Sequence, residues 1–213
     1  MRQLVFCTIV MGASLAWGQD QSITKAFLFD SYQDGVIVNH KGGKVPVLLN
    51  YSTREEKLYI KKGDHEMALE YELNIDTVYF GLRPFVFADD FFMELLINGD
   101  VSLYRRHQAK FIETGTSIGY GTKTQTGTTD SFRFAPREKK DVPEGFMLKE
   151  SMVYYVHYQG TTVELKKWGN IFRLIPEVKP NLKKYIKQYS LNVNDDAFKA
   201  VLFCNQELMA LSQ

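Results

Sequence analysis

Cysteine is scarce in this chain, and its scarcity excludes a fold held together by disulfides. The 213 residues include two cysteines, Cys7 and Cys204, and Cys7 lies in an N-terminal segment that we expect to be removed. Because one cysteine cannot form an intramolecular disulfide, the chain has to be stabilised by buried apolar side chains. We therefore expect one domain, with or without an appendage, built around a substantial hydrophobic core.

An excess of charge of either sign is also missing. The chain has 26 basic and 25 acidic residues, and loss of the first 18 residues removes Arg2 and leaves 25 of each. A balanced chain offers neither the basic surface that nucleic acid requires nor a polybasic patch for anionic lipid. We expect no nucleic-acid partner.

Apolar runs long enough to span a membrane as a helix are absent too. The N-terminal run, residues 4–15, is shorter than the roughly 20 residues that a spanning helix needs. With Arg2 before it and Ala16-Trp17-Gly18 after it, the run is typical of a secretory signal peptide cleaved before Gln19. We expect residues 1–18 to be a signal peptide, no transmembrane segment, and export to the periplasm or beyond, with or without association with the outer membrane.

What the sequence does contain is a series of short apolar runs separated by turn residues. Gly42-Gly43, Lys62-Gly63-Asp64 and Gln159-Gly160 each separate two such runs. This spacing is typical of antiparallel hairpins. For residues 19–175 we expect a mainly β (α+β) domain, an antiparallel meander that forms an open barrel or a sandwich.

Asn98-Gly99 is the strongest hairpin signal, because both residues tolerate the positive φ angles of a type I′ turn. The strand before it is apolar on both faces, which predicts that both faces are covered. One face carries Met93, Leu95 and Ile97, and the other carries Phe92, Glu94 and Leu96. We therefore place this hairpin in the middle of the fold.

The same hairpin carries a resemblance to known proteins. The residues concerned are Phe92, Glu94, Leu96, Gly99, Ser102, Leu103 and Tyr104, preceded by hairpins such as residues 36–49. Their pattern resembles a group of exported β-rich proteins of unknown function from Gram-negative bacteria, over roughly the first half of the chain after residue 18. The resemblance implies export and a β-rich core, and it carries no catalytic residue.

Helical periodicity begins near the C-terminus. Leu182, Tyr185, Ile186 and Tyr189 recur at helical spacing after Pro180, a residue suited to the first turn. A second apolar stripe follows Asn194 or Asp195, either of which can cap a helix. We expect residues 176–213 to form two α-helices packed on the β domain, and residues 171–175 to be its last strand.

Residues 114–145 have no apolar period and are rich in threonine, glycine and charge, which predicts a mobile loop. Within it, Gly115-Thr116-Ser117-Ile118-Gly119 matches the nucleophile elbow of serine hydrolases. That motif requires a helix after the serine. Because the residues that follow are rich in glycine and threonine, we do not expect Ser117 to be a nucleophile.

The candidate ligand-binding residues are Tyr154, Tyr155, His157, Tyr158 and Trp168. Such a group can line a sugar or lipid pocket, although aromatic residues on strands more often build a core. Histidines elsewhere lack the spacing of a local metal site, and Asp64-His65-Glu66 and Asp89-Asp90 are typical of solvated turns. We expect no metal, no cofactor and no catalytic residue.

These features favour an exported, non-enzymatic module that binds a protein or another cell-envelope component. The first alternative is a carrier of a small apolar or glycan ligand, with a calycin-like barrel and residues 114–145 as a lid. The second is a hydrolase that uses Ser117 or a histidine–carboxylate pair.

Overall fold

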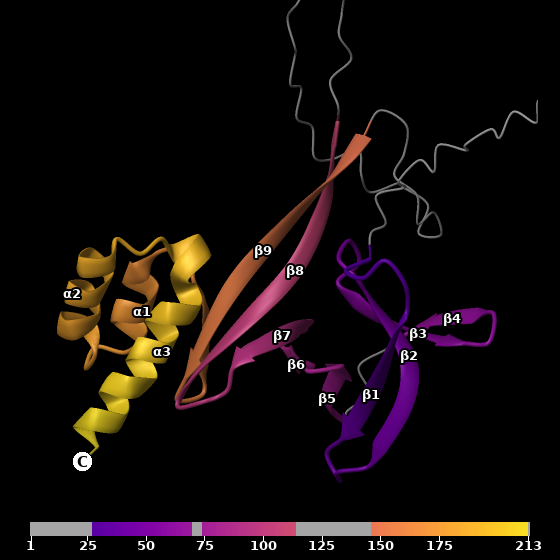
Figure 1. The fold of residues 1–213 in the computed structure, drawn as a ribbon, viewed down its shortest axis with the longest axis horizontal. Coiled ribbons are helices and arrows are strands. Elements are labelled where there is room, and N and C mark those ends of the chain that lie inside the picture. Colours follow the sequence, from indigo (N-terminus) through magenta and orange to yellow (C-terminus); the bar gives the residue numbers. More distant parts are fainter. Residues whose placement is uncertain (1–26, 70–73, 114–145, 213) are drawn as a thin grey trace, which may run out of the picture.

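The computed structural model describes residues 27–69, 74–113 and 146–212, which form ten strands and three helices (Figure 1). The predicted signal peptide and the predicted loop lie outside the described residues. In the described ranges, no helix is long and apolar enough to cross a membrane. The strands are β1 (Gln33–Asn39), β2 (Lys44–Ser52), β3 (Lys57–Lys62), β4 (His65–Ala68), β5 (Ile75–Phe80), β6 (Arg83–Ala88), β7 (Phe91–Ile97), β8 (Val101–Glu113), β9 (Phe146–Tyr158) and β10 (Thr161–Glu164).

All ten strands belong to one antiparallel sheet in the order β10-β9-β8-β7-β6-β5-β1-β2-β3-β4. Successive strands are neighbours within β1–β4 and within β5–β10, and the two series join where β5 pairs with β1. The sheet departs from a simple meander at that junction and is not closed. The prediction of a mainly β fold, an open barrel or sandwich with C-terminal helices, is confirmed.

The sheet curls so that the turn after β2 returns to β8. The Ala109 N–H donates to the Thr53 carbonyl (2.8 Å), and the Tyr51 hydroxyl donates to the His107 carbonyl (3.3 Å). These bonds hold the end of β2 against β8 without forming a strand ladder. The inner face of the curled strands therefore encloses apolar side chains.

The C-terminal helices are α1 (Trp168–Leu174), α2 (Lys179–Tyr189) and α3 (Val193–Leu211). The predicted strand at residues 171–175 is wrong, because α1 occupies most of it; Ile171 and Ile175 are both buried, and their spacing fits one face of a helix. Pro180 lies in the first turn of α2, as predicted. The cap of α3 is Asn192, whose side chain accepts from the Asn194 N–H (2.9 Å), two residues before the earliest predicted cap.

The β7–β8 hairpin is present, but its predicted type I′ turn is wrong, since neither Asn98 nor Gly99 has a positive φ angle. Two other hairpin turns, Asp89-Asp90 and Gln159-Gly160, do have positive φ angles at both of their residues. Gly99 serves another purpose, because a Cβ atom there would lie 2.8 Å from the Asn205 side chain of α3. Close approach of a helix, and not backbone conformation, requires glycine at this position.

A bulge at Leu96 changes which side chains of β7 share a face. Glu94 pairs with Arg105 of β8, whereas Ile97 pairs with Leu103, so one extra residue lies on β7 between the two pairs. Ile97 therefore faces the same side as Glu94. The sequence had placed Ile97 on the opposite face, and that assignment is wrong.

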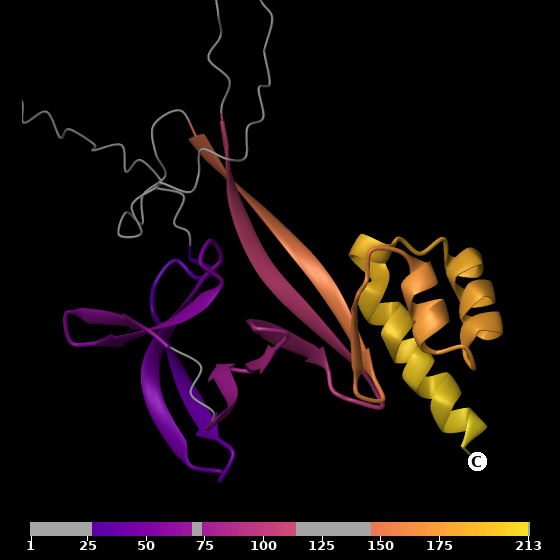
Figure 2. The same cartoon turned by 180° about the vertical axis from the view of Figure 1, so that it is seen from behind.

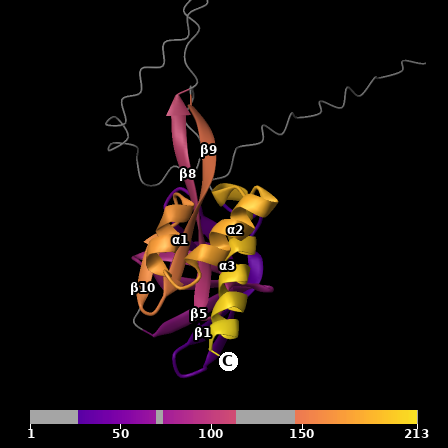
Figure 3. The same ribbon diagram turned by 90° about the vertical axis from the view of Figure 1, so that its left-hand side faces the viewer.

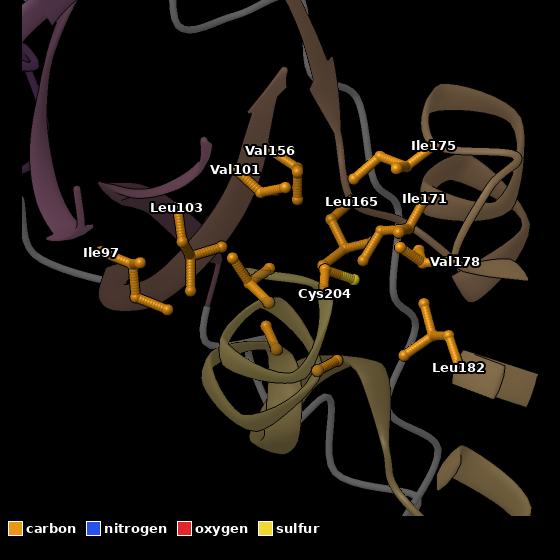
Figure 4. Packing of buried hydrophobic residues seen from close by; sticks show 13 residues of the cluster. Ile97, Val101, Leu103, Val156, Leu165, Ile171, Ile175, Val178, Leu182 and Cys204 are labelled. Atoms are coloured by element: carbon orange, nitrogen blue, oxygen red, sulfur yellow. The ribbon is translucent and has the colours of Figure 1, made fainter. Parts of the chain in front are cut away.

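Buried apolar side chains form two large groups. Helices α1–α3, which contribute to one group, and strands β2 and β3, which contribute to the other, lie at opposite ends of the molecule (Figures 1 and 2). The three helices cover one end of the sheet (Figure 3), and their side chains pack with those of β7–β9 in the group that Figure 4 shows. We call this group the helical core: Ile97, Val101, Leu103, Val156, Leu165, Ile171, Ile175, Val178, Leu182, Ala197, Ala200, Val201 and Cys204. We call the other the strand core: Leu49, Tyr51, Leu58, Val78, Phe80, Phe85 and Phe92.

Candidate functional site

Four polar side chains meet on the inner face of the sheet, and we call them the ion cluster: Arg83 of β6, Glu94 of β7, and Arg105 and His107 of β8. Arg83 donates to both carboxylate oxygens of Glu94, from Nε (2.7 Å) and Nη2 (2.9 Å). Arg105 donates to Oε2 from Nε (3.0 Å) and Nη2 (2.8 Å). His107 Nε2 lies 2.7 Å from the same oxygen.

Strand register places the ion cluster between the two cores. Glu94 pairs with Arg105 across β7 and β8, and His107 follows two residues later on the same face of β8. Along this face of β7, Phe92 belongs to the strand core and Ile97 to the helical core, with Glu94 between them. The charged side chains therefore occupy the boundary between two apolar groups.

Hydrogen bonding decides the charge state of this site. Burial alone would raise the pKa of Glu94, but the bonds from His107, Arg83 and Arg105 outweigh burial and hold that pKa well below its usual range. Glu94 is therefore ionised at neutral pH. With two guanidinium groups and one carboxylate, the ion cluster has an excess of positive charge.

The Glu94–His107 pair is the kind of pair that the hydrolase alternative requires, so its surroundings matter. The imidazole of His107 is flanked by the rings of Phe85 (6.1 Å between centroids) and Tyr51 (6.2 Å). Within the described part of the chain, no hydroxyl or thiol is hydrogen-bonded to that imidazole. Cys204 lies elsewhere, in the helical core, where burial raises the pKa of its thiol to about 12. The pair is a buried hydrogen-bonded contact beside two aromatic rings, and among the described residues no nucleophile is bonded to it.

A second ion pair lies on the opposite face of β8. Arg106 Nε donates to the carboxylate of Glu56 in the β2–β3 turn, and Nη1 donates to the Tyr155 hydroxyl (3.2 Å). Burial would lower the pKa of Arg106, but its bonds to Glu56 and Tyr155 raise that pKa instead. This pair fastens the β2–β3 turn to β8.

The five candidate ligand-binding residues do not share one face of the sheet. Tyr154 and Tyr158 pack against the helical core, as does Trp168, whose Nε1 donates to the Leu191 carbonyl (3.2 Å). Tyr155 and His157 alternate with the two other tyrosines on β9 and therefore point to the opposite face.

On that opposite face, Tyr155 bonds Arg106, while His157 Nδ1 lies 2.9 Å from the Thr162 hydroxyl and its ring packs edge-on against Tyr104. Each candidate aromatic thus has a protein partner. The structure brings Tyr154, Tyr158 and Trp168 together with apolar neighbours, and it separates them from Tyr155 and His157.

Beyond β7 and β10, strands β8 and β9 continue as a two-stranded ribbon that extends away from the helices (Figures 1 and 2). We call residues 107–113 and 146–152 the β-arm; they pair in register from His107–Met152 to Glu113–Phe146. Leu148 packs with Ala109 and Phe111 on the inner face of the arm. Met147 and Met152 are more than half exposed (52 % and 60 %).

One edge of the β-arm presents backbone groups that nothing in the described ranges pairs. The Tyr154 carbonyl accepts from the Leu165 N–H (2.8 Å), so Tyr154 directs its backbone groups away from β8. Because backbone direction alternates along a strand, Leu148, Glu150 and Met152 point the same way. Strand β10 ends its pairing at Tyr155, and no described residue bonds these three on that side.

The remaining predicted sites fall into three groups. Asp89-Asp90 forms the β6–β7 turn, and Gly63 is in a left-handed turn before His65 at the start of β4, as the solvated-turn interpretation predicts. His40 lies 3.5 Å from Asp76 in an exposed pair, and no group of metal-ligating side chains occurs in the described ranges. Ser117 lies outside the described residues.

Sequence reasoning missed the ion cluster, although two signals for it were present. Glu94 is the one charge in an otherwise apolar strand, and Arg105 and His107 are spaced by two on the next strand. A charge inside a doubly covered strand requires partners on neighbouring strands. Arg83 carried no such signal, since its position depends on how β6 pairs with β7.

The chain matches no protein-family model, and comparison with curated proteins and with solved structures also finds no match. Function therefore has to be argued from the residues themselves.

Proposed function

We propose that the chain is an exported, non-enzymatic module that binds another protein of the cell envelope through the β-arm. The observation that carries the proposal is the arm itself, a ribbon with two exposed methionines, Met147 and Met152, and with one edge that no residue of ranges 27–69, 74–113 and 146–212 pairs. Methionine side chains adapt to irregular apolar surfaces and are common at binding surfaces. The N-terminal sequence pattern supports export.

The other inner surfaces of the sheet are occupied by the protein's own side chains. The ion cluster satisfies Glu94 internally, and the strand core is filled by large residues with no exposed surface, such as Tyr51, Phe85 and Leu49. These observations favour neither a carrier of a small ligand nor a hydrolase. The proposal of protein binding therefore rests on the β-arm.

Site-specific photo-crosslinking in the native host tests this function. A photoreactive residue at Lys149, exposed on the β-arm, is compared with one at Leu82, which is 99 % exposed in the β5–β6 turn. We expect an envelope protein adduct of defined mass from position 149 and none from position 82, with both variants in the exported fraction. Retention in the cytoplasm, equal labelling at both positions, or no adduct at 149 would overturn the proposal.

A further inference from the structure

We propose that the edge of β9 beyond its pairing with β10 accepts an extended segment of the partner protein as an additional antiparallel strand. This inference rests on the proposed function and names the form that the partner takes. It starts from Leu148, Glu150 and Met152, whose backbone N–H and C=O groups point away from β8 without a partner in the described part of the chain.

The spacing of these groups determines what can satisfy them. Along one edge of a strand, every second residue presents one N–H donor and one C=O acceptor. Another extended strand carries donors and acceptors at the same spacing and can bond all of them. The segment from Leu148 to Met152 is about 14 Å long at the usual rise of a strand. It therefore offers room for roughly five residues of a partner, continuing the sheet where β10 stops.

Natural proteins usually protect such an edge, by a charge that points into it, by a bulge or by a covering loop. Strand β9 has no register shift along its ladder with β8, so the arm remains a regular template. The charges of this segment, Lys149 and Glu150, lie on opposite faces of the ribbon, so neither side chain points along the backbone edge.

Side chains beside the edge predict the composition of the added strand. On one face, Glu150 stands between Leu148 and Met152; on the other, Lys149 stands between Met147 and Ser151. Opposite charges on directly facing residues stabilise a strand pair, and like charges destabilise it. The partner segment should therefore have a basic residue opposite Glu150, an acidic residue opposite Lys149, and apolar residues at both ends.

A synthetic peptide supplies a defined probe for this edge. Acetyl-Thr-Val-Thr-Lys-Glu-Val-Thr-amide, aligned antiparallel, places its lysine opposite Glu150 and its glutamate opposite Lys149. Methylating the backbone nitrogens of its two valines and its lysine removes the donors that would face β9. Methylating its glutamate and second threonine leaves those donors intact and serves as the matched control.

Hydrogen exchange of the full exported chain, read by NMR, reports the edge directly. In the free protein, the amides of Leu148, Glu150 and Met152 should exchange rapidly, while those of Met147, Lys149 and Ser151, which face β8, should be protected. The control peptide should slow the first set at least tenfold, and the peptide methylated on its β9-facing nitrogens should not.

A proline substitution tests the same bonds from the protein side. Glu150→Pro removes an N–H that points away from β8, so the β8–β9 ladder should persist, while peptide affinity should fall at least tenfold. Glu150→Thr keeps the N–H and should bind within a few-fold of wild type. If the β8-facing amides of Glu150→Pro remain protected from exchange, the arm is still folded. If that protection is lost, the comparison of the two methylated peptides decides the test.

Three results would overturn the strand-addition proposal: protection of the three edge amides in the free monomer, protection that depends on protein concentration and signals a second copy, or equal binding of both methylated peptides. An adduct at position 149 in the cell without selective peptide binding would retain the proposed function and reject strand addition. Absence of that adduct would reject the proposed function itself.

Discussion

The helical core and the strand core lie against the same face of one sheet but are built from different side chains. Four of the seven buried residues of the strand core are aromatic, and their rings pack tilted or edge-on, as in the Phe80–Phe85 pair (5.1 Å between centroids). The buried helical core contains no aromatic residue among its members and includes Ala197 and Ala200 of α3. Small residues let a helix approach a sheet closely, whereas rings fill the space inside curled strands.

This difference follows the order of the chain. Buried members of the strand core come from residues 49–92, and those of the helical core come from residues 97–204. The boundary crosses β7 between Phe92 and Ile97, where Glu94 and its partners lie. Two apolar groups, each continuous in sequence, are therefore joined through charged contacts, which predicts that each group can loosen separately.

The largest expected effect comes from emptying one core at a time. Phe85→Ala should cost about 3–5 kcal/mol and Leu182→Ala about 2–5 kcal/mol of unfolding free energy, because each side chain is fully buried. Urea unfolding measures the totals, and amide exchange locates the loss. We expect faster exchange in β1, β2 and β5 for Phe85→Ala and in α1–α3 for Leu182→Ala. Uniform acceleration in both variants would show one cooperative core.

Removing the charge at the boundary should rank next. Glu94→Gln leaves Arg83, Arg105 and His107 without their anion, and breaking a buried pair in this way costs about 3 kcal/mol when the partners keep some solvent access. The matched control is Glu164→Gln, which breaks the exposed pair with Lys166 and should leave the free energy of unfolding close to that of wild type. Equal effects in urea unfolding would mean that the ion cluster does not join the cores.

Acid should weaken the same boundary. The pKa of Glu94 is lower in the folded state than its ordinary value of 4.5, so the unfolded state binds the proton more readily. The stabilisation by Glu94 is therefore present above pH 4.5 and is lost as the pH falls below it. Melting temperature measured from pH 7 to pH 3 should fall more steeply for wild type than for Glu94→Gln. Parallel curves would assign the acid sensitivity to other carboxyl groups.

Local sequence patterns predicted the elements that depend on neighbouring residues. The hairpins at Gly42-Gly43 and Gln159-Gly160 and the helix that begins near Pro180 all appear where expected. The strand predicted at residues 171–175 failed because a short apolar run fits a strand and a buried helix equally well, and packing against the sheet decides between them.

Contacts between distant residues could not be predicted in the same way. The turn at Asn98-Gly99 lacks its expected conformation, and α3, about a hundred residues later, approaches Gly99 closely through Asn205. The single inserted residue at Leu96 has no composition signal, yet it decides whether Ile97 joins the helical core. The ion cluster likewise needs four side chains from three strands. Sequence spacing predicts a shared face for Arg105 and His107, which both belong to β8, but it does not predict the positions of the other two.

The contact that holds α3 to the β7–β8 turn should show a smaller effect than either core. Asn205 accepts from the Val101 N–H (2.9 Å) and donates to the Val101 carbonyl (2.8 Å), so its side chain replaces a strand partner for a buried residue. Asn205→Ala leaves these backbone groups unpaired and should cost about 1–3 kcal/mol. We expect faster exchange of the Val101 amide while the amides of β1 and β2 are unchanged, which would place the loss in the helical end alone.

Gly99 provides the smallest and most specific test of this end. A Cβ atom at Gly99 would approach the Asn205 Oδ1 to 2.8 Å, a distance that real Cβ atoms do not adopt, so one of the two groups has to move. Gly99→Ala should therefore cost about 1 kcal/mol when Asn205 is present. In the Asn205→Ala background the obstructing side chain is gone, and the same substitution should cost close to nothing. Urea unfolding of the two single variants and the double variant gives the coupling. If the two costs simply add, the cost of Gly99→Ala does not arise from contact with Asn205, and the close approach of α3 does not explain the glycine.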